Sequence, residues 1–170
     1  MADSAEYFEH LVRLCAGKDP LQIQAGTPAA IGDLIEALPE ARLRLRPAAD
    51  KWSVVEIVAH LAEDELVTSW RYRQMLENPG CSLTGFDQDK WAAYGRYREW
   101  SAREALEMFR LLRGANLRML RALNDEEWAR YGEHAERGRI TVRDLSSHMA
   151  GHDMNHLEQI HALLENSARG

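Results

Sequence analysis

Cysteine is scarce in this 170-residue sequence, which contains only Cys15 and Cys81. The two residues are far apart, so there is no CxxC pair and the chemistry of that motif is excluded. We expect both side chains to be reduced thiols, as is usual in a cytoplasmic protein.

Long apolar runs are also absent. No stretch reaches the roughly 18 consecutive apolar residues that indicate a transmembrane helix. The first ten residues, MADSAEYFEH, contain no basic region followed by an apolar core, so the sequence predicts no signal peptide. We therefore expect a cytoplasmic location and no membrane partner.

Basic residues are outnumbered by acidic ones. The 21 Lys and Arg against 27 Asp and Glu give a net charge of −6, which argues against a general nucleic-acid-binding surface. Arginines do gather in two places, but acidic residues lie between them, which favours solvated helix faces. These arginines are Arg42, Arg44, Arg46, Arg110, Arg113, Arg118 and Arg121.

Several catalytic motifs are missing as well. The sequence has no Gly-rich phosphate loop, no G-x-S-x-G turn and no H-E-x-x-H helix. His152 and His156 have the spacing of the last motif, but Asp153 stands where a zinc protease has glutamate. We therefore do not interpret this segment as a protease site.

The apolar residues that are present recur mainly at helical spacing. Alternation of period two is absent, so we predict no pair of strands. No linker or repeat divides the chain, which indicates one domain over residues 1–170 with a core at about 19–166. Four main helices and several short elements predict an all-α four-helix bundle with a polar site between facing helices.

Capping signals mark where the main helices begin. Thr27 followed by Pro28 favours a helix start there, after a loop at 18–26. Ser53 with Glu56 fits a capping box, and Thr141 with Asp144 marks the start of the last helix, 141–165. The other predicted segments are a short amphipathic segment at 3–16, a loop at 77–90 that is a candidate to wall a cleft, a helix at 101–123 and a loop at 132–138.

Four of the seven histidines lie in the last predicted helix. Two of them, His152 and His156, occupy its apolar stripe, where a bundle helix normally has leucine. Residues four apart have Cβ atoms about 5–6 Å apart, so both rings can reach one metal ion. His148 is also four residues from His152, so spacing alone leaves both pairs open, beside ordinary histidines that bind no metal.

His60 stands among apolar residues of the helix that follows Ser53. A buried polar group needs a partner, so His60 either bonds to a nearby carboxylate or carbonyl, or faces His152 and His156 across a helix interface. Three imidazoles would suit zinc, nickel or another divalent transition metal. They would leave an open position for water, a substrate or a thiolate.

Other polar residues could orient the ligand rings or lie outside the site. A ligand ring needs a hydrogen-bond acceptor that sets its tautomer, and the carboxylates within sequence reach of His60 are Glu56, Glu63 and Asp64. Three histidines have no partner pattern and are predicted to lie at the surface: His10, His134 and His161.

Two blocks of sequence form a specific combination. The first, RPAADKWSVVEIVAHLAEDE, combines K-W-S-x-x-E with a following H-L. The second, GRITVRDLSSHMAGHDMNHLEQI, places H-x-x-x-H before Gln-Ile. From about residue 19 onward the chain resembles the DinB-like superfamily, which is related to damage-inducible proteins and to low-molecular-weight-thiol S-transferases. The matching residues are Asp19, Pro20, Thr27, Pro28, Trp52, Ser53, His60, Glu65, Gly138, His152, Asp153, His156 and Gln159.

The resemblance implies an up-down-down-up four-helix bundle and a metal site made by His60, His152 and His156. It selects the second histidine pair and leaves His148 as a neighbour. Glu63 departs from the pattern, because family members often have aspartate there. Homodimers are frequent in such proteins, so we expect a homodimer.

The resemblance does not specify a reaction. It implies a metal-dependent enzyme acting on a small molecule, either a transferase of low-molecular-weight thiols or a hydrolase-like enzyme. The first alternative is a stress-related protein that binds a metal or small ligand without catalysis. The second is a structural helical module that dimerises.

Overall fold

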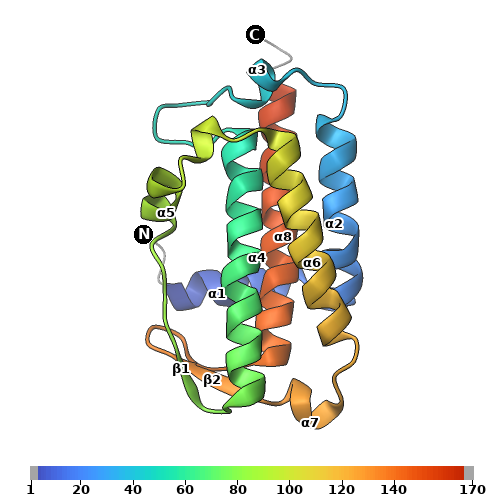
Figure 1. Ribbon diagram of the computed structural model, residues 1–170, viewed down its shortest axis with the longest axis vertical. Coiled ribbons are helices and arrows are strands. Elements are labelled where there is room, and N and C mark those ends of the chain that lie inside the picture. The colour runs from blue at the N-terminus through green and yellow to red at the C-terminus, as the bar shows by residue number, and fades with distance from the viewer. Residues whose placement is uncertain (1–3, 167–170) are drawn as a thin grey trace.

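Four long helices form the body of the protein in the computed structural model, which describes residues 4–166 (Figure 1). Residue 3 of the predicted first segment and the ends of the predicted domain lie outside this range. No helix in the described range is long and apolar enough to cross a membrane. The bundle helices are α2 (Pro20–Ile35), α4 (Val54–Glu77), α6 (Ala102–Leu120) and α8 (Val142–Asn166). The shorter elements are α1 (Ser4–Leu14), α3 (Glu40–Leu43), β1 (Cys81–Leu83), α5 (Gln88–Tyr94), the 3₁₀ helix η1 (Tyr97–Glu99), α7 (Asp125–Trp128), β2 (Tyr131–His134) and β3 (Gly138–Thr141).

The bundle helices follow an up-down-down-up order, which confirms the predicted fold. In Figure 1, α2 and α8 run upward, whereas α4 and α6 run downward. Because α4 and α6 are parallel neighbours, the chain between them must return along the bundle. That return carries β1, α5 and η1, and α5 stands beside the bundle on it.

Two of the predicted helix starts are confirmed by their capping hydrogen bonds. At α4, the Ser53 hydroxyl accepts from the Glu56 amide, and the Glu56 carboxylate accepts from the Ser53 amide at 2.9 Å. At α8, Thr141 and Asp144 exchange the same pair of bonds, at 3.0 and 3.1 Å. Each pair satisfies amide groups that a helix start leaves without an intrahelical partner.

The predicted start of the second helix at Thr27 is wrong. Helix α2 begins earlier, with Asp19 as its N-cap and Pro20 as its first residue, so most of the predicted loop is helical. Thr27 and Pro28 lie inside the helix, where the Thr27 hydroxyl donates to the Ile23 carbonyl at 2.9 Å. Both Asp19-Pro20 and Thr27-Pro28 are good local starts, and packing of the longer helix decides between them.

A side chain from another helix donates a hydrogen bond to the backbone carbonyl that Pro28 leaves without its helical donor. Proline has no N–H, so it cannot donate to the carbonyl four residues earlier, that of Gln24. This carbonyl instead accepts from Arg113 Nη1 at 2.8 Å. The hydrogen bond that proline removes from α2 is therefore replaced by one from α6.

The chain also contains a small sheet, so the prediction of no paired strands is wrong. Strand β1 pairs parallel to β2 with Cys81 opposite Gly132, and β2 pairs antiparallel to β3 with Gly132 opposite Ile140. The predicted loop at 132–138 is therefore mostly strand and hairpin turn. Strands of three and four residues are too short to show the alternation that identifies a strand in a sequence.

One buried arginine contacts all four bundle helices. Arg113 on α6 is only 1% exposed, so the prediction of a solvated face is wrong for this member of the arginine group. Its Nη2 lies 2.9 Å from Asp153 on α8 and 2.9 Å from Glu65 on α4. Together with the bond to the Gln24 carbonyl on α2, these contacts fix the four helices in register one residue from His152.

Helix α1 lies across the bundle and packs directly on α8 (Figure 1). The close approach is at Gly151, where an added Cβ would lie 1.8 Å from the Leu11 carbonyl oxygen. Leu11 is fully buried, and Phe8 stacks on His148 with ring centroids 4.5 Å apart. The absence of a side chain at Gly151 therefore allows α1 to lie beside His152.

We expect Arg113→Met to lower the free energy of unfolding by about 3–5 kcal/mol, because it leaves two buried carboxylates without their cation. Arg110→Met is the matched control, since this α6 arginine is solvated and pairs loosely with Glu107 at 3.8 Å. The control should change stability by less than about 0.5 kcal/mol in urea unfolding followed by circular dichroism. Equal stability of the two variants would contradict the assigned contacts.

We expect Gly151→Ala to destabilise the protein by about 3 kcal/mol, because the new Cβ must displace the backbone of α1. Gly26→Ala is the control, since Gly26 lies exposed in α2 with open space around its Cα. It should stabilise the protein by about 0.5–1 kcal/mol through helix propensity. Urea unfolding of both variants measures the two effects, and a neutral Gly151→Ala result would disprove the close contact.

Candidate metal centre

Three buried histidines bring one ring nitrogen each to a common point. His60 comes from α4, and His152 and His156 come from consecutive turns of α8. The Nε2 atom of His152 lies 3.1 Å from that of His60 and 3.0 Å from that of His156. The structure thus places the three predicted site residues together, with the pair on α8 that the resemblance selects.

The spacing of these nitrogens fits a metal ion. Two nitrogens that each lie about 2.0–2.1 Å from one ion are separated by roughly 2.9–3.4 Å at angles from square to tetrahedral. The measured separations lie at the lower end of this interval. Three neutral imidazoles whose Nε2 atoms face one another cannot all satisfy those atoms by mutual hydrogen bonds. The donor set is therefore one that a divalent transition metal can complete.

The neighbours of the two α8 rings set their orientation. Gln159 Oε1 lies 2.7 Å from His156 Nδ1, so this nitrogen donates and leaves the lone pair of Nε2 free for a ligand. His152 Nδ1 has no hydrogen-bond partner in the described chain, and Asp64 Oδ2 approaches it to 3.7 Å. The carboxylate nearest the site thus faces His152, although the sequence associated it with His60.

The other two candidate carboxylates have different partners. Glu56 caps α4 and pairs with Arg46. Glu63 accepts a hydrogen bond from the Tyr97 hydroxyl at 2.7 Å. The predictions that Glu56 or Glu63 orients a ligand ring are not supported by these contacts. The indole of Trp52 instead packs beside His60, with ring centroids 5.0 Å apart.

Burial keeps the ligand rings neutral. Desolvation, together with the neighbouring His156, lowers the pKa of His60 to about 3. Desolvation also lowers the pKa of His152 and of His156. Neutral imidazole is the form that binds a metal, so protons do not compete for these nitrogens near neutral pH. Burial has the opposite effect on Asp64, whose pKa it raises to about 6 despite the nearby Arg71.

The remaining histidines in the described chain divide into buried and exposed ones. His10 and His161 are exposed, as predicted. His134 is buried at the end of β2, so its predicted surface position is wrong. His148 is buried one turn before His152 on α8, and its ring stacks on Phe8 of α1 and does not belong to the group of three converging nitrogens.

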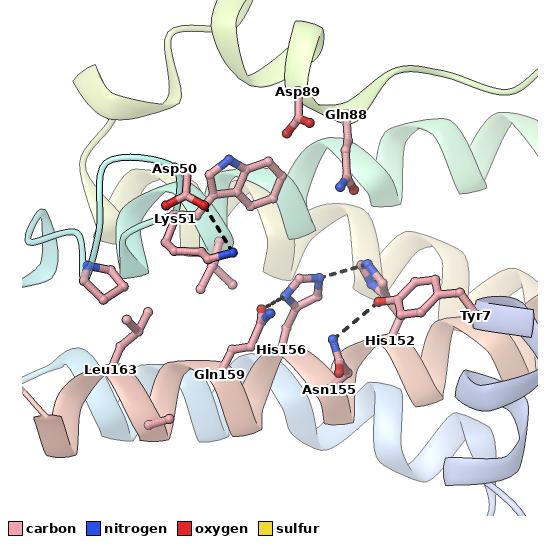
Figure 2. Close-up of a pocket in the computed structure, with 14 residues that line it drawn as sticks. Tyr7, Asp50, Lys51, Gln88, Asp89, His152, Asn155, His156, Gln159 and Leu163 are labelled. Carbon is pink, nitrogen blue, oxygen red and sulfur yellow. Dashed lines mark hydrogen bonds and ion pairs between the residues drawn. The ribbon is translucent and has the colours of Figure 1, made fainter. Parts of the chain in front are cut away.

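A cavity of about 500 Å³ opens beside the histidines. His152 and His156 form part of its wall on α8, and Gln88 and Asp89 of α5 face them from the opposite side (Figure 2). The segment 77–90 does contribute to the wall of a cleft, as predicted, but it is only partly a loop, because Cys81–Leu83 form β1 and its last residues begin α5. Tyr7 also lines the cavity, and nothing in its short amphipathic segment had marked it as a site residue.

The model of the DinB superfamily matches residues 25–160, most of the chain. The chain belongs to the DinB superfamily. Two bacterial relatives, OB0413 of Oceanobacillus iheyensis and YfiT of Bacillus subtilis, carry the name "putative metal-dependent hydrolase". They are 23% and 21% identical to this chain over 141 residues, which is 81% and 82% of this chain and 79% of each relative.

A solved structure of YfiT from Bacillus subtilis shares the fold of this DinB-superfamily chain. The two structures superpose with a TM-score of 0.81 at 20% identity, over 86% of this chain and 85% of YfiT. That protein is described as a "probable metal-dependent hydrolase with an unusual four-helix bundle topology". The likeness supports the up-down-down-up arrangement of the helices.

We expect the metal-free protein to lose stability as the pH falls below 6.5, because its buried histidines resist protonation. Burial, with Arg137 and Arg71, lowers the pKa of His148 to about 3. At His148, the unfolded chain therefore binds one proton that the folded chain does not bind between pH 6.5 and 3. His148 contributes its full stabilisation above pH 6.5 and loses about 1.4 kcal/mol per pH unit below it. The pKa of Asp64 is raised to about 6, so its carboxyl holds a proton in the folded chain between pH 6 and 3.8. In that interval Asp64 offsets the loss of stability caused by one buried histidine.

His148→Gln isolates this contribution, because glutamine keeps a polar side chain of similar size that does not titrate. The slope of unfolding free energy against pH, measured in urea between pH 4 and 6, should decrease by about 1.4 kcal/mol per pH unit. His161→Gln, on the exposed face of the same helix, is the control and should retain the wild-type slope. An unchanged slope in His148→Gln would show that His148 takes up a proton in the folded protein.

Proposed function

We propose that this protein is a metal-dependent hydrolase in which His60, His152 and His156 bind one divalent transition ion. The observation that carries the proposal is that the Nε2 atom of His152 lies 3.1 Å from that of His60 and 3.0 Å from that of His156. The metal-dependent hydrolase names of OB0413 and YfiT support the same class of reaction. Zinc and nickel suit a set of three imidazoles, and we propose one of these two.

The bound ion would supply Lewis-acid activation of a water molecule or a carbonyl oxygen. The protein residues have separate tasks around it. Gln159 holds the His156 ring in the tautomer that presents Nε2, and burial keeps all three rings neutral. His152 and His156 face the cavity, so a substrate can reach the site from that side, whereas Trp52 packs over His60.

The preformed geometry supports a catalytic role for the three histidines. The three nitrogens already lie together in the chain, because α4 and α8 are fixed in register by Arg113. Side chains that are held in place before the substrate arrives do not have to be ordered during the reaction. Three protein ligands also leave coordination positions open, as catalytic metal sites require.

Transfer of a low-molecular-weight thiol and metal binding without catalysis are the competing functions. Both would use the same three histidines, so the choice depends on which compound enters the cavity. Thiol transfer requires a thiol and an electrophile as joint substrates, whereas hydrolysis requires one substrate and water. A homodimer stays a prediction for any of these functions.

We expect wild-type protein loaded with Zn²⁺ or Ni²⁺ to hold close to one ion per chain after dialysis, and His152→Ala to bind it at least about 100-fold more weakly. His161→Ala is the matched control on α8, because its ring is exposed and remote from the three nitrogens. Metal content by mass spectrometry and titration calorimetry provide the measurements. Unchanged binding in His152→Ala would refute the proposed site.

The loaded wild-type protein should also hydrolyse members of a panel of nitrophenyl esters and anilides, and His152→Ala should not. The same preparation is tested with glutathione, bacillithiol and mycothiol together with an electrophile. Thiol conjugation without hydrolysis would make it a transferase. Full metal loading without turnover on either panel would make it a binding protein.

A further inference from the structure

Helix α1 lies outside the segment that matches the DinB superfamily, which begins at residue 25. It is nevertheless docked firmly beside the candidate metal centre. Its backbone lies against Gly151, Leu11 is fully buried, and Phe8 stacks on His148. These contacts hold the preceding residue, Tyr7, at the edge of the cavity.

The hydroxyl of Tyr7 lies at the end of the cavity that contains the histidines. Figure 2 shows the Tyr7 ring entering from α1, with its hydroxyl directed toward the α8 side chains. Asn155 Nδ2 donates to this oxygen at 3.4 Å, and both residues line the cavity with His152 and His156. Because the amide supplies the proton of that contact, the O–H of Tyr7 is left to donate to another oxygen.

The phenol is in its donor form near neutral pH. Burial raises the pKa of Tyr7 above its ordinary value, and the negative charge of Asp64 acts in the same direction. The ring is still 39% exposed, so a molecule in the cavity can reach the hydroxyl. A neutral hydroxyl at this position is a hydrogen-bond donor fixed by α1 and Asn155.

The opposite end of the cavity has an apolar wall and a charged rim, where Asp50 and Lys51 form an exposed ion pair. Along α8 the lining runs from His152 to Leu163, a distance of about 16–17 Å at the rise of a helix. Ile57 and Trp52 line the cavity from the α4 side, and Figure 2 shows Leu163 at the end away from Tyr7. The cavity is therefore polar at the histidines and has an apolar wall beyond them, with room for a drug-sized molecule.

We propose that the substrate is a small ester or amide with an apolar chain, and that Tyr7 donates a hydrogen bond to its carbonyl oxygen as that oxygen gains negative charge. This inference rests on the proposed hydrolase function. In the reaction, the oxygen of water bonds to the carbonyl carbon, the bond from that carbon to the leaving oxygen or nitrogen breaks, and a proton of water passes to the leaving group. Tyr7 keeps its own proton throughout and acts by hydrogen bonding.

Hydroxamic acids test both parts of the proposal, because they place a charged oxygen at a metal ion and carry chains of chosen length. Zinc-loaded wild-type protein, Tyr7→Phe and Tyr94→Phe are titrated with acetohydroxamic and octanohydroxamic acid by calorimetry. Tyr94 is 87% exposed on α5 and does not line the cavity, so it is the matched control. Zinc affinity of each variant is measured separately.

We expect Tyr7→Phe to bind both hydroxamates about tenfold more weakly, with zinc affinity unchanged and Tyr94→Phe like the wild type. Octanohydroxamic acid should bind at least about tenfold more tightly than acetohydroxamic acid, and Leu163→Asn should reduce this difference. Equal affinity of Tyr7→Phe and wild type would overturn the assigned hydrogen bond. Equal affinity of the two hydroxamates for the wild type would overturn the apolar substrate class.

The readouts separate this inference from the function on which it rests. If the wild type binds no zinc, the proposed function fails and the inference falls with it. If the wild type binds zinc and hydrolyses esters while Tyr7→Phe matches it in hydroxamate affinity and in kcat/KM, only the inference fails. A decrease in kcat/KM in Tyr7→Phe that parallels the loss of hydroxamate affinity supports the assigned contact.

Discussion

The contact on which the rest of the structure depends is the buried guanidinium of Arg113. It bonds to Asp153 on α8, Glu65 on α4 and a carbonyl of α2, while its own backbone belongs to α6. Burying these charges is costly, and burial does raise the pKa of Asp153, an effect that the neighbouring Arg113 opposes. Such a network is satisfied only in one register of the four helices, so it contributes specificity where an apolar contact would tolerate sliding.

That register is what the histidines need. Asp153 directly follows His152, and Glu65 lies five residues after His60 on α4. When Arg113 fixes these two positions relative to each other, it also fixes the rings of His60 and His152 across the interface of α4 and α8. The same dry surroundings that make the ion pairs costly keep the imidazoles neutral, which is the form a metal ion binds.

Local chemistry explains how much of this could be predicted from the sequence. The capping residues Ser53 and Thr141 act on their own helix starts, so their pattern is sufficient to place those starts. The spacing of His152 and His156 follows from helix geometry alone. The choice of that pair over the one with His148 came from the family resemblance, because the deciding partner, His60, comes from another helix.

The failed predictions share a dependence on distant partners. The local sequence at Pro28 predicts a helix start. Its place inside α2 is explained by Arg113, which donates to the Gln24 carbonyl that Pro28 cannot bond. Arg113 itself resembles its solvated neighbours until its carboxylate partners on α4 and α8 are known. The strands are too short to have a pattern of their own, and β1 pairs with β2, which follows the intervening α6 in the chain. His134 is buried because it ends one of these strands.

The residues that line the cavity come from two parts of the chain, which bears on how such a protein selects its substrate. The three converging histidines belong to the segment that matches the DinB superfamily, whereas Tyr7 comes from α1, before that segment begins. A helix that packs on α8 through Gly151 can change the polar end of the cavity without disturbing the register that Arg113 imposes. The nitrogens would then set the class of chemistry, and the residues around the cavity would set which molecule undergoes it. On this view, differences in substrate among proteins of this fold should arise mainly in α1 and in the α4–α6 connection, which contribute Tyr7, Gln88 and Asp89 to the cavity.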